Sequence, residues 1–594
     1  MAAYSAPIAE MRFILSSIVG LDTLNTLPGY EDATADLVDA ILEEAAKLAD
    51  QVIAPLNAIG DRHGATLNGN TVSMPPGFAE AYAQYRDGGW NAIPFNPEFG
   101  GQGLPWAVAT AVQEMWHSAN MAFGLCPTLN QGAVEALDTH GTAEQKTLYL
   151  PKLIAGTWTG TMNLTEPQAG TDLGAVRCRA ERLGNGSFGI TGQKIFITYG
   201  DHDLAENIIH LVLARVPGAP AGVKGISLFL VPKFLPDDRG EPGLRNDAHC
   251  VGIEHKLGIH ASPTCVMSYG DNGDGGAVGF LIGEENRGLE YMFTMMNNAR
   301  LAVGLQGVAI AERARQQALA HARDRVQGRP IGGDQGHGSG APAIVEHPDV
   351  RRMLLDMRSR TDMARTLAYY VAARLDVAKK HPDAGQRDSA QKRVDLLIPV
   401  VKAYATDLGV DVASMGIQVH GGMGYIEETG AAQHLRDARI APIYEGTNGI
   451  QANDLVFRKT ARDGGGAMTA YIADIRDVAA NAARIGGPVC GAVAEHLNAG
   501  IDTLELATKW IVETASSDPA RAAAASSRFL ECVGLVACGH MAAMSVIAAT
   551  DNPETAPPDK QDLCRYFAEQ WLSRAPGLST AIMAMADLHD YAIN

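Results

Sequence analysis

The sequence predicts a mainly α-helical protein with one β-rich domain in its middle, and three changes of pattern predict it. Ala, Leu, Glu and Gln recur with helical spacing from about residue 32 to 154. Short β-branched runs between turn residues replace this pattern from residue 161 to about 288. Helical periodicity then returns from residue 289 to about 459, and a last helical region follows the linker Asp463-Gly464-Gly465-Gly466.

The chain is too long for one hydrophobic core, so these stretches are expected to form separate domains. At 594 residues, length alone suggests about three or four of them. We expect strands at residues 194–199, 208–214, 226–232 and 264–269. In chain order the predicted domains are an N-terminal helical domain (1–160), an antiparallel β-domain (161–288), a helical bundle (289–462) and an extra C-terminal helical domain (467–594).

Composition and charge exclude several classes of protein. Apolar residues make up 46% of the chain and charged residues 19%, which indicates a globular rather than a disordered protein. The net charge of −19 argues against binding to nucleic acid or to an anionic membrane surface. From Gly466 onward there are 8 Lys and Arg against 15 Asp and Glu, a balance of 8 − 15 = −7, which disfavours DNA binding by the C-terminal region.

Neither the cysteines nor the N-terminus show a metal-binding or targeting pattern. The eight cysteines are scattered without a C-x-x-C pair, so we expect reduced, buried thiols in a cytoplasmic protein and no metal site. The apolar run from Phe13 to Leu21 lacks a basic flank and is too short to span a membrane, so we expect neither a signal peptide nor a membrane segment. The apolar stretch from Val533 to Ala549 contains Gly539 and His540 and is predicted to be a packed helix.

Two segments of the predicted β-domain combine hydroxyl groups, glycines and aromatic residues. The first is Met162-Asn163-Leu164-Thr165-Glu166-Pro167-Gln168-Ala169-Gly170-Thr171-Asp172. Its hydroxyl and backbone N–H groups can donate to carbonyls or to a pyrophosphate without a phosphate-binding lysine. The second is the β-branched strand Gly192-Gln193-Lys194-Ile195-Phe196-Ile197-Thr198-Tyr199-Gly200. Such strands are common, so the second segment is informative mainly through its spacing from the first.

Two segments of the predicted helical bundle offer an open backbone to a ligand. In Gln418-Val419-His420-Gly421-Gly422-Met423-Gly424-Tyr425, paired glycines end a helix and let the main chain approach a planar molecule. In Pro442-Ile443-Tyr444-Glu445-Gly446-Thr447-Asn448-Gly449-Ile450-Gln451, one carboxylate is held between a tyrosine and a glycine. Taken alone, a carboxylate in such a helix-to-loop corner is usually a surface glutamate, so its significance depends on the other three segments.

These four segments, in this order, resemble those of the acyl-CoA dehydrogenases, flavoenzymes that desaturate fatty-acyl thioesters. The resemblance covers about residues 32–459, and larger members of the family also carry an extra C-terminal helical domain. It implies the acyl-CoA dehydrogenase fold with a central β-barrel domain, bound FAD, and Glu445 as the base that removes the α-proton of the thioester. The implied FAD contacts are Met162, Leu164, Thr165, Gly170, Thr171, Phe196, Thr198, Arg325, Gln327, His347, Gln418, Gly421, Gly422, Thr447 and Gly449. The implied substrate contacts are Asn297, Arg300 and Gly446.

Three positions depart from or refine the common family pattern. Met162 stands where many relatives have an aromatic residue, and Phe196 where a tryptophan is frequent, so the wall beside the flavin ring differs. Some relatives place the base at the position of Ala299, and alanine cannot accept a proton. Glu445 is therefore the candidate base that the family pattern supports.

The resemblance also implies a reaction and partners. The β-hydride of the acyl-CoA passes to FAD, a trans-2-enoyl-CoA forms, and an electron-transferring flavoprotein receives the electrons. In the family, the elements around Arg325, Gln327 and Gln418 serve the FAD of a neighbouring subunit. We therefore expect a homodimer, with the C-terminal domain covering the surface that smaller relatives use to form tetramers.

Several functions stay open at this point. Chain length, the N-terminal Tyr4-Ser5-Ala6-Pro7-Ile8 and the C-terminal extension resemble a family member that oxidises a sulfur-containing acyl thioester in dimethylsulfoniopropionate breakdown. A dehydrogenase for short and medium acyl chains in fatty-acid β-oxidation has the same architecture. An acyl-CoA oxidase would replace the flavoprotein acceptor with oxygen. A non-catalytic, DNA-associated alkylation-response protein uses this fold too, but needs a basic C-terminal region.

Overall fold

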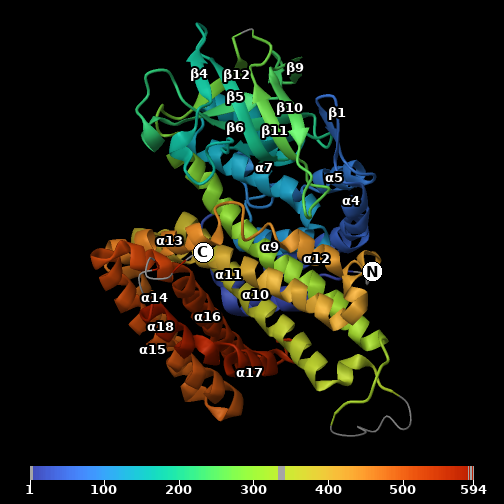
Figure 1. Cartoon of the computed structure of the whole chain (residues 1–594), viewed down its shortest axis with the longest axis vertical. Helices are drawn as coiled ribbons and strands as arrows, with labels where there is room; N and C mark the ends of the chain where they lie inside the picture. The colour runs from blue at the N-terminus through green and yellow to red at the C-terminus, as the bar shows by residue number, and fades with distance from the viewer. Residues whose placement is uncertain (1–3, 274, 332–340, 586–587, 589–591, 593–594) are drawn as a thin grey trace. The chain divides into compact units, whose positions relative to one another are not determined.

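A computed structural model describes residues 4–273, 275–331, 341–585, 588 and 592, without the side chain of Asn297 (Figure 1). The chain divides into two compact units. One comprises residues 48–104 and 119–299, and the other residues 1–47, 105–118 and 300–594. We call them the β-unit and the helical unit. The four predicted domains stay predictions, because each unit combines segments from several of them.

The β-unit pairs a group of helices with a sheet. Its helix α8 (Ala143–Ala155) begins with a capping box, because Thr142 Oγ1 accepts the N–H of Gln145 at 3.2 Å and the Gln145 side chain accepts the N–H of Thr142 at 3.0 Å. A short hairpin that the sequence did not predict lies in the N-terminal region. The other elements here are α4 (Asn57–His63), β1 (Thr66–Asn68), β2 (Thr71–Ser73), α5 (Phe78–Asp87) and α7 (Met121–His140).

The sheet of the β-unit is mixed, not antiparallel as the sequence predicted. Its order is β10-β11-β5-β12-β7-β6-β3, with β4 paired to β5. Strands β3 and β6 are parallel, with Met162 opposite Leu211, and the other pairs of this sheet are antiparallel. The strands are β3 (Trp158–Asn163), β4 (Arg179–Arg182), β5 (Phe188–Thr198), β6 (Asn207–Ala214), β7 (Ser227–Pro232), β8 (Phe234–Pro236), β9 (Pro242–Arg245), β10 (Ala248–Ile253), β11 (Thr264–Tyr269) and β12 (Ala277–Ile282).

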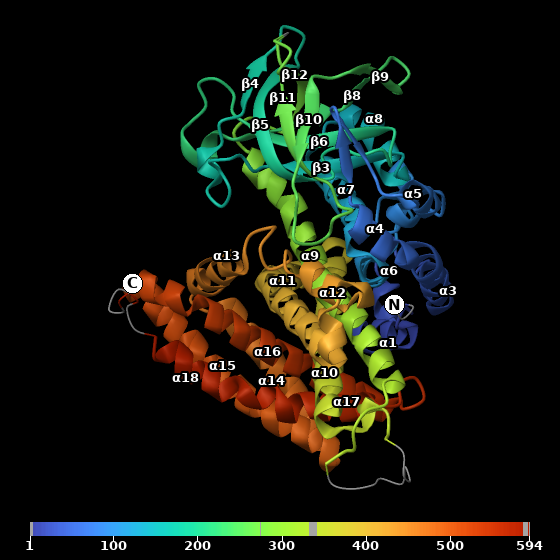
Figure 2. The same ribbon diagram turned by 45° about the vertical axis from the view of Figure 1, so that its right-hand side comes forward.

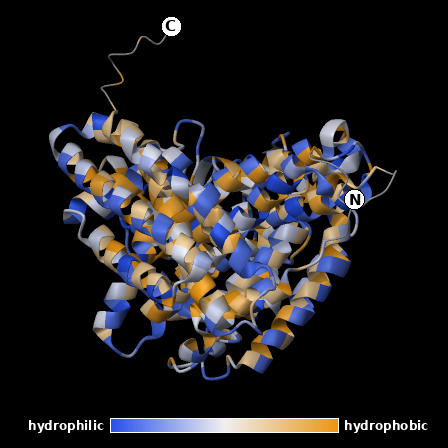
Figure 3. Cartoon of the chain, turned by 90° about the horizontal axis from the view of Figure 1, so that it is seen from below, coloured by the Kyte–Doolittle hydropathy of each residue, from blue (hydrophilic) through white to orange (hydrophobic). Residues whose placement is uncertain are grey.

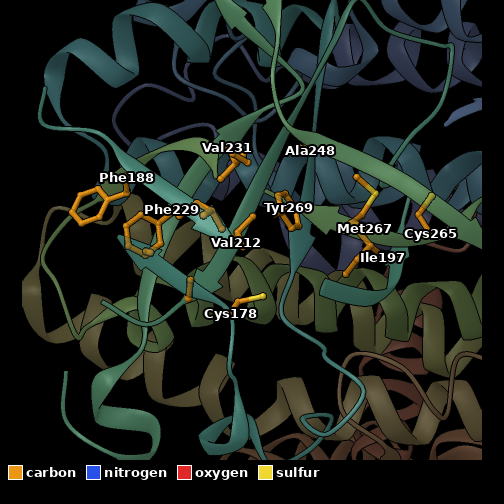
Figure 4. Packing of buried hydrophobic residues seen from close by; sticks show 14 of the residues in the cluster. Cys178, Phe188, Ile197, Val212, Phe229, Val231, Ala248, Cys265, Met267 and Tyr269 are labelled. Carbon is orange, nitrogen blue, oxygen red and sulfur yellow. The ribbon is translucent and has the colours of Figure 1, made fainter. Parts of the chain in front are cut away.

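One hydrophobic core holds this sheet together (Figure 4). Phe188 and Phe229 lie with ring centroids 5.0 Å apart, and Val212, Val231 and Tyr269 are buried in the same cluster. Each aromatic or branched side chain that is buried here stabilises the folded protein by about 1.5–3 kcal/mol. The core therefore fixes β5, the strand that carries the second candidate flavin segment.

The helical unit is built from long helices, drawn side by side in Figures 1 and 2. Helix α9 (Gly288–Asp324) begins in the β-unit and ends in this one. Hydrophobic and hydrophilic residues both occur along the helices, as amphipathic packing requires (Figure 3). The others are α1 (Ile8–Phe13), α2 (Leu21–Leu24), α3 (Ala35–Leu48), α6 (Trp106–Ala119), α10 (Pro348–Lys380), α11 (Ala384–His420), α12 (Ala431–Ala438), α13 (Asn448–Asn453), α14 (Gly466–Ile485), α15 (Gly487–Ser517), α16 (Pro519–Asp551), α17 (Lys560–Gln570) and α18 (Ala575–Met583).

Glycines let α9 and α11 pack with their backbones in contact. A Cβ atom on Gly307 would lie 2.1 Å from the carbonyl oxygen of Ala405, and one on Gly409 would lie 2.7 Å from the carbonyl oxygen of Gly307. No side chain fits at these points, so both glycines are required for the contact. This close packing fixes the positions of polar residues on α9 and α11.

The apolar stretch near the C-terminus is a packed helix, as predicted. By length and composition alone, α16 could cross a membrane, but 83% of its most apolar window is buried inside the protein. It contacts α10, α15 and α17. These contacts are those of a core helix in the helical unit.

Candidate active site

In the β-unit, the first flavin segment is a turn that follows β3. Met162 ends up 8% exposed, Leu164 and Thr165 are partly exposed, and Gly170 and Thr171 are exposed. The carbonyl oxygen of Thr165 accepts the N–H of Ile195 at 2.9 Å. The turn is thereby joined to β5, and the structure brings the first two predicted segments together.

A buried ion pair holds this turn. Lys194 is fully buried, and its Nζ donates to Glu166 Oε1 at 2.8 Å and to the carbonyl oxygen of Leu164 at 3.0 Å. Glu166 also accepts the N–H groups of Arg177 at 2.7 Å and Cys178 at 3.1 Å. Burial opposes the charge on Glu166, but Lys194 and these N–H groups hold its pKa below the ordinary value. The carboxylate is therefore ionised and fully bonded beneath the turn.

A β-bulge turns Phe196 outward from the strand. The register of β5 against β11 shifts between the Ile197–Cys265 and Lys194–Met267 pairs, and Phe196 has φ 59°. A bulge re-aims a side chain, here into solvent, where Phe196 is 58% exposed. Thr198 is partly exposed, and its carbonyl oxygen accepts the hydroxyl of Thr161 at 2.7 Å. An exposed aromatic face beside hydroxyl groups suits a flavin ring.

In the helical unit, Glu445 lies in the loop between α12 and α13. The residue is partly buried and has φ 55°, a left-handed conformation that costs a non-glycine residue about 1–2 kcal/mol. The next residue, Gly446, has φ 83°, and a Cβ atom there would lie 2.7 Å from Gln451 Nε2. Thr447 caps α13 by accepting the N–H of Ile450 at 3.3 Å, and Gly449 is exposed. The backbone after Glu445 is therefore tightly specified.

Buried side chains from neighbouring helices hold this loop. Gln451 is fully buried and donates to the carbonyl oxygens of Glu445 at 3.3 Å and Gly446 at 3.2 Å. The Tyr444 hydroxyl donates to Gln306 of α9. Strain at a position fixed from several sides is typical of functional loops.

Two buried cations act on the Glu445 carboxylate. Burial raises the pKa of Glu445, while Arg300 and Lys402 oppose that rise. Arg300 is 7% exposed, and its Nη1 lies 3.7 Å from Asp454 Oδ2. Lys402 is fully buried on α11. The loop therefore presents a carboxylate that has lost much of its hydration and is stabilised by positive charge.

The glycine turn at the end of α11 is open, as expected for a surface that a ligand approaches. Gly421 has φ 61°, and a Cβ atom on Gly421 or Gly422 would meet no atom within 4 Å. Gln418 is exposed. Gly424 differs, because a Cβ atom there would lie 2.3 Å from the carbonyl oxygen of Ile417. Gly424 shapes the turn, and the first two glycines leave its surface free.

Three further predicted FAD contacts lie together in the helical unit. The carbonyl oxygen of Arg325 accepts the N–H of Ile344 at 2.7 Å, and His347 Nε2 is 2.8 Å from the carbonyl oxygen of Gln327. Arg325 and Gln327 are exposed. An exposed arginine beside a histidine suits a phosphate-bearing ligand.

The residues present fit FAD and a CoA thioester. In the β-unit, the exposed aromatic face at Phe196 and the hydroxyl groups near it suit a flavin ring. In the helical unit, the open turn at Gly421 and the exposed cation Arg325 suit the adenine and phosphate groups of a dinucleotide. Ala299 is buried and offers no alternative base. The Asn297 side chain lies outside the described residues, so its predicted substrate contact stays a prediction.

Sequence reasoning missed the residues that support the site. Lys194 has the same strand parity as the buried Phe188 and Ile190, which signals a buried cation in need of a partner. Lys402 stands alone in the apolar run Ile398-Pro399-Val400-Val401-Lys402-Ala403. Both signals are visible in the sequence, but their partners, Glu166 and Asn448, are not.

Comparison with known proteins agrees with this reading. The chain matches the acyl-CoA dehydrogenase N-terminal domain at residues 36–157, the middle domain at 161–271 and the C-terminal domain at 286–458. Residues 471–589 match a domain described as acetyl-CoA dehydrogenase C-terminal like. The extra helical region thus matches a known domain of its own.

Two relatives and one solved structure cover most of the chain. The 3-methylmercaptopropionyl-CoA dehydrogenase of Ruegeria pomeroyi is 48% identical over 92% of this chain and 91% of its own length. A broad-specificity linear acyl-CoA dehydrogenase of Mycobacterium tuberculosis is 36% identical over 80% of this chain and 78% of its own. The fold matches an acyl-CoA dehydrogenase of Bacillus anthracis, solved with FAD, at a TM-score of 0.75 and 18% identity over 98% of this chain and 93% of that one. The chain therefore belongs to the acyl-CoA dehydrogenase family and is an FAD-binding oxidoreductase that acts on acyl-CoA.

Proposed function

We propose that Glu445 is the general base of an α,β-dehydrogenation that converts an acyl-CoA thioester to a trans-2-enoyl-CoA. The observation that carries this proposal is the partly buried carboxylate, held in a strained loop and facing two buried cations. Loss of hydration raises the pKa of Glu445 and strengthens it as a base. A perturbed carboxylate in a rigid loop is typical of catalytic sites.

The remaining residues position the reactants. The α C–H of a thioester is a weak acid, so the developing negative charge on the thioester oxygen needs a donor; we assign the backbone N–H of Glu445 to that role. We assign Gly446, Arg300 and Asn297 to the acyl-CoA. FAD, when bound, accepts the β-hydride. Its contacts are proposed at Met162, Leu164, Thr165, Gly170, Thr171, Phe196, Thr198, Arg325, Gln327, His347, Gln418, Gly421, Gly422, Thr447 and Gly449.

Substitution of Glu445 by Gln tests the base. Glu445→Gln keeps the size of the side chain and removes its basicity, and general base catalysis contributes about 10²–10⁴ in rate. We expect flavin reduction by acyl-CoA, followed by stopped flow, to slow by at least 10²-fold, while FAD stays bound.

The exposed Glu554→Gln, in the C-terminal region, serves as the control and is expected to react like the wild type. Near wild-type reduction by Glu445→Gln would show that the base lies elsewhere.

We propose a short, sulfur-containing acyl-CoA, 3-methylmercaptopropionyl-CoA, as the substrate in dimethylsulfoniopropionate breakdown. The 48% identity to the Ruegeria enzyme over nearly the whole chain supports it. The relative with broad specificity for linear acyl-CoA supports straight short and medium chains as the second candidate. A panel of acyl-CoA thioesters assayed with a dye acceptor separates the two, and a higher kcat/KM for butyryl-CoA or hexanoyl-CoA than for the methylthio compound would favour the second.

We propose an electron-transferring flavoprotein as the electron acceptor, in keeping with family membership. An acyl-CoA oxidase would instead release peroxide. The test is peroxide release during turnover in air: its absence, together with turnover on added flavoprotein, is expected. Stoichiometric peroxide would assign the chain to the oxidases.

We propose a homodimer in the cytoplasm. Next to the glycine turn, three apolar side chains are exposed in the single chain, Met423 at 54%, Tyr425 at 85% and Ile426 at 45%, and a second subunit would cover them. The eight cysteines are free and buried, which suits a reducing compartment. Light scattering that gives an active, flavin-loaded monomer would refute the dimer, and cell fractionation tests the location.

A further inference from the structure

Lys402 on α11 is buried, and no carboxylate in the described part of the chain forms a direct ion pair with it. Lys402 is fully buried, and its Nζ donates to Asn448 Oδ1 at 2.8 Å. An ammonium group has three donors and is rarely buried, because burial without compensation is costly. Its position therefore calls for an explanation in terms of nearby charge.

Asn448 links this lysine to the Glu445 loop. Its backbone N–H donates to the carbonyl oxygen of Pro442 at 3.0 Å, which closes the loop around Glu445. Its side-chain amide donates to Asp407 Oδ1 at 2.8 Å and to the carbonyl oxygen of Ala403 at 3.1 Å. The amide orientation is thereby fixed with its oxygen toward Lys402.

The charged groups around Lys402 come from each neighbouring element. Glu445 from the loop and Asp407 from α11 favour the charged lysine, and Arg300 from α9 disfavours it. Arg300 itself interacts with Asp454, Glu445 and Arg458. Because Arg300 Nη1 lies 3.7 Å from Asp454 Oδ2, the charge of Arg300 is shared between Asp454 and Glu445. Lys402 adds a second positive charge that acts on Glu445.

We propose that Lys402 is a positioning residue for the reaction: its buried ammonium group, held by Asn448, keeps the Glu445 carboxylate ionised before acyl-CoA binds. This inference rests on the proposed role of Glu445 as the base. It assigns a function to a residue outside the predicted FAD and substrate contacts.

The pH range of this effect follows from the lysine itself. Burial lowers the pKa of Lys402 to about 7, so its positive charge is present below that pH and is lost above it. An opposite charge close by lowers a carboxyl pKa by about 1–3 units. Lys402 therefore assists Glu445 on the acidic side, where the carboxylate would otherwise be protonated, and has no charge to offer in alkaline solution.

Replacement of Lys402 by Met tests the proposal on the full-length, FAD-loaded enzyme. The acidic limb of the kcat/KM profile, which reports the free enzyme, is expected to move to higher pH by about 1 unit. At pH values below the limb the variant is then about tenfold slower than the wild type, and above about pH 8 the two rates converge.

Lys392→Met is the matched control, since Lys392 lies on the same helix, is exposed and pairs with Asp388 at 2.6 Å. Its profile should match the wild type. Asn448→Ala keeps the positive charge of Lys402 and removes the hydrogen bond that holds its ammonium group. We expect this variant to turn over more slowly at all pH values, with a smaller shift of the acidic limb than in Lys402→Met. A shift as large as that of Lys402→Met would overturn the assignment of the effect to the charge.

Titration of the Glu445 carboxyl in the FAD-free protein is an independent measurement. It can be made even if the Lys402 variant does not bind FAD. The infrared difference spectrum between the FAD-free protein and its Glu445→Gln variant reports the protonation of the Glu445 carboxyl. The same difference is measured in the Lys402→Met background. We expect the midpoint to rise when the lysine is removed. An unchanged midpoint, with Glu445→Gln inactive, would overturn the role of Lys402 and leave the base in place; an active Glu445→Gln would overturn the base itself.

Discussion

Glu166 and Lys194 show how two buried charged side chains can hold the turn of the first predicted flavin segment. Glu166 is 3% exposed and Lys194 is fully buried; Lys194 donates to the carbonyl oxygen of Leu164, and Glu166 accepts the N–H of Cys178. A buried pair of this kind contributes little net stability, but removal of one partner leaves a buried, uncompensated charge. The pair thus makes the shape of the turn sensitive to a single substitution.

Lys194→Met is expected to reduce both FAD content and stability. The substitution leaves Glu166 buried without its cation, at a cost of about 3–5 kcal/mol. The flavin absorbance relative to protein after gel filtration, and the melting temperature, measure the two effects. Lys47→Met is the control, because Lys47 is 59% exposed and pairs with a surface glutamate. Full FAD content in Lys194→Met would show that the turn does not depend on the pair.

At the scale of elements, the contact between α9 and α11 places the residues on both sides of the Glu445 loop. Gln306 and Arg300 lie on α9, and Lys402 lies on α11. The two backbones touch at Gly307 and Gly409. A change in the distance between these helices would therefore move Gln306, which accepts the Tyr444 hydroxyl, relative to Lys402.

Gly307→Ala is expected to lower both stability and turnover. The added methyl group would lie 2.1 Å from a backbone oxygen, so the helices must separate, and overpacking of this kind costs about 1–3 kcal/mol. Melting temperature and flavin reduction rate measure the effect. Gly416→Ala on α11 is the matched control, since its Cβ atom would meet its nearest neighbour at 3.6 Å. Equal behaviour of the two variants would contradict a tight helix contact.

Local patterns predicted the elements better than their pairing. The strands at β6, β7 and β11 were placed within one residue of their ends because β-branched runs and turns are local signals. The parallel pairing of β3 with β6 was missed, because it depends on a crossover through β4 and β5. The hairpin β1–β2 was missed because its strands have three residues each.

The candidate site divides in the same way. Glu445, the glycine turn and the flavin segments were predicted because each is a short run with its own chemistry. Lys402 and Glu166 were not selected, because their importance depends on partners 46 and 28 residues away in the sequence. Ligand contacts can be predicted from short motifs, whereas the residues that hold those motifs in place require the fold.

At the scale of the whole molecule, a buried ionic cluster joins the N-terminal segment to the C-terminal helices within the helical unit. Lys560 on α17 contacts Glu10 on α1, 550 residues away, and lies 3.8 Å from Asp362 on α10. Arg365 then donates to Glu114, Glu312 and Asp362 at 2.8–3.0 Å. The extra C-terminal region is thereby part of the same folded body as the start of the chain.

Lys560→Met is expected to destabilise the helical unit by about 3–5 kcal/mol, because Glu10 and Asp362 lose a shared, fully buried cation. Differential scanning calorimetry measures the shift, and limited proteolysis shows whether the N-terminal segment is released. Arg565→Met on the same helix is the control, since its pair with Glu569 is exposed. Equal melting of the two variants would contradict a structural role for the cluster.

The left-handed conformations of Phe196 and Glu445 have a consequence for attempts to engineer this protein. Glycine adopts φ near 55–59° without strain, so replacement of either residue by glycine would relieve about 1 kcal/mol. A selection for heat resistance alone would favour those replacements, although one would remove the proposed base and the other a proposed FAD contact. Thermostability and activity therefore compete at residues 196 and 445. A mutant library screened for thermostability should keep Phe196 and Glu445 unchanged.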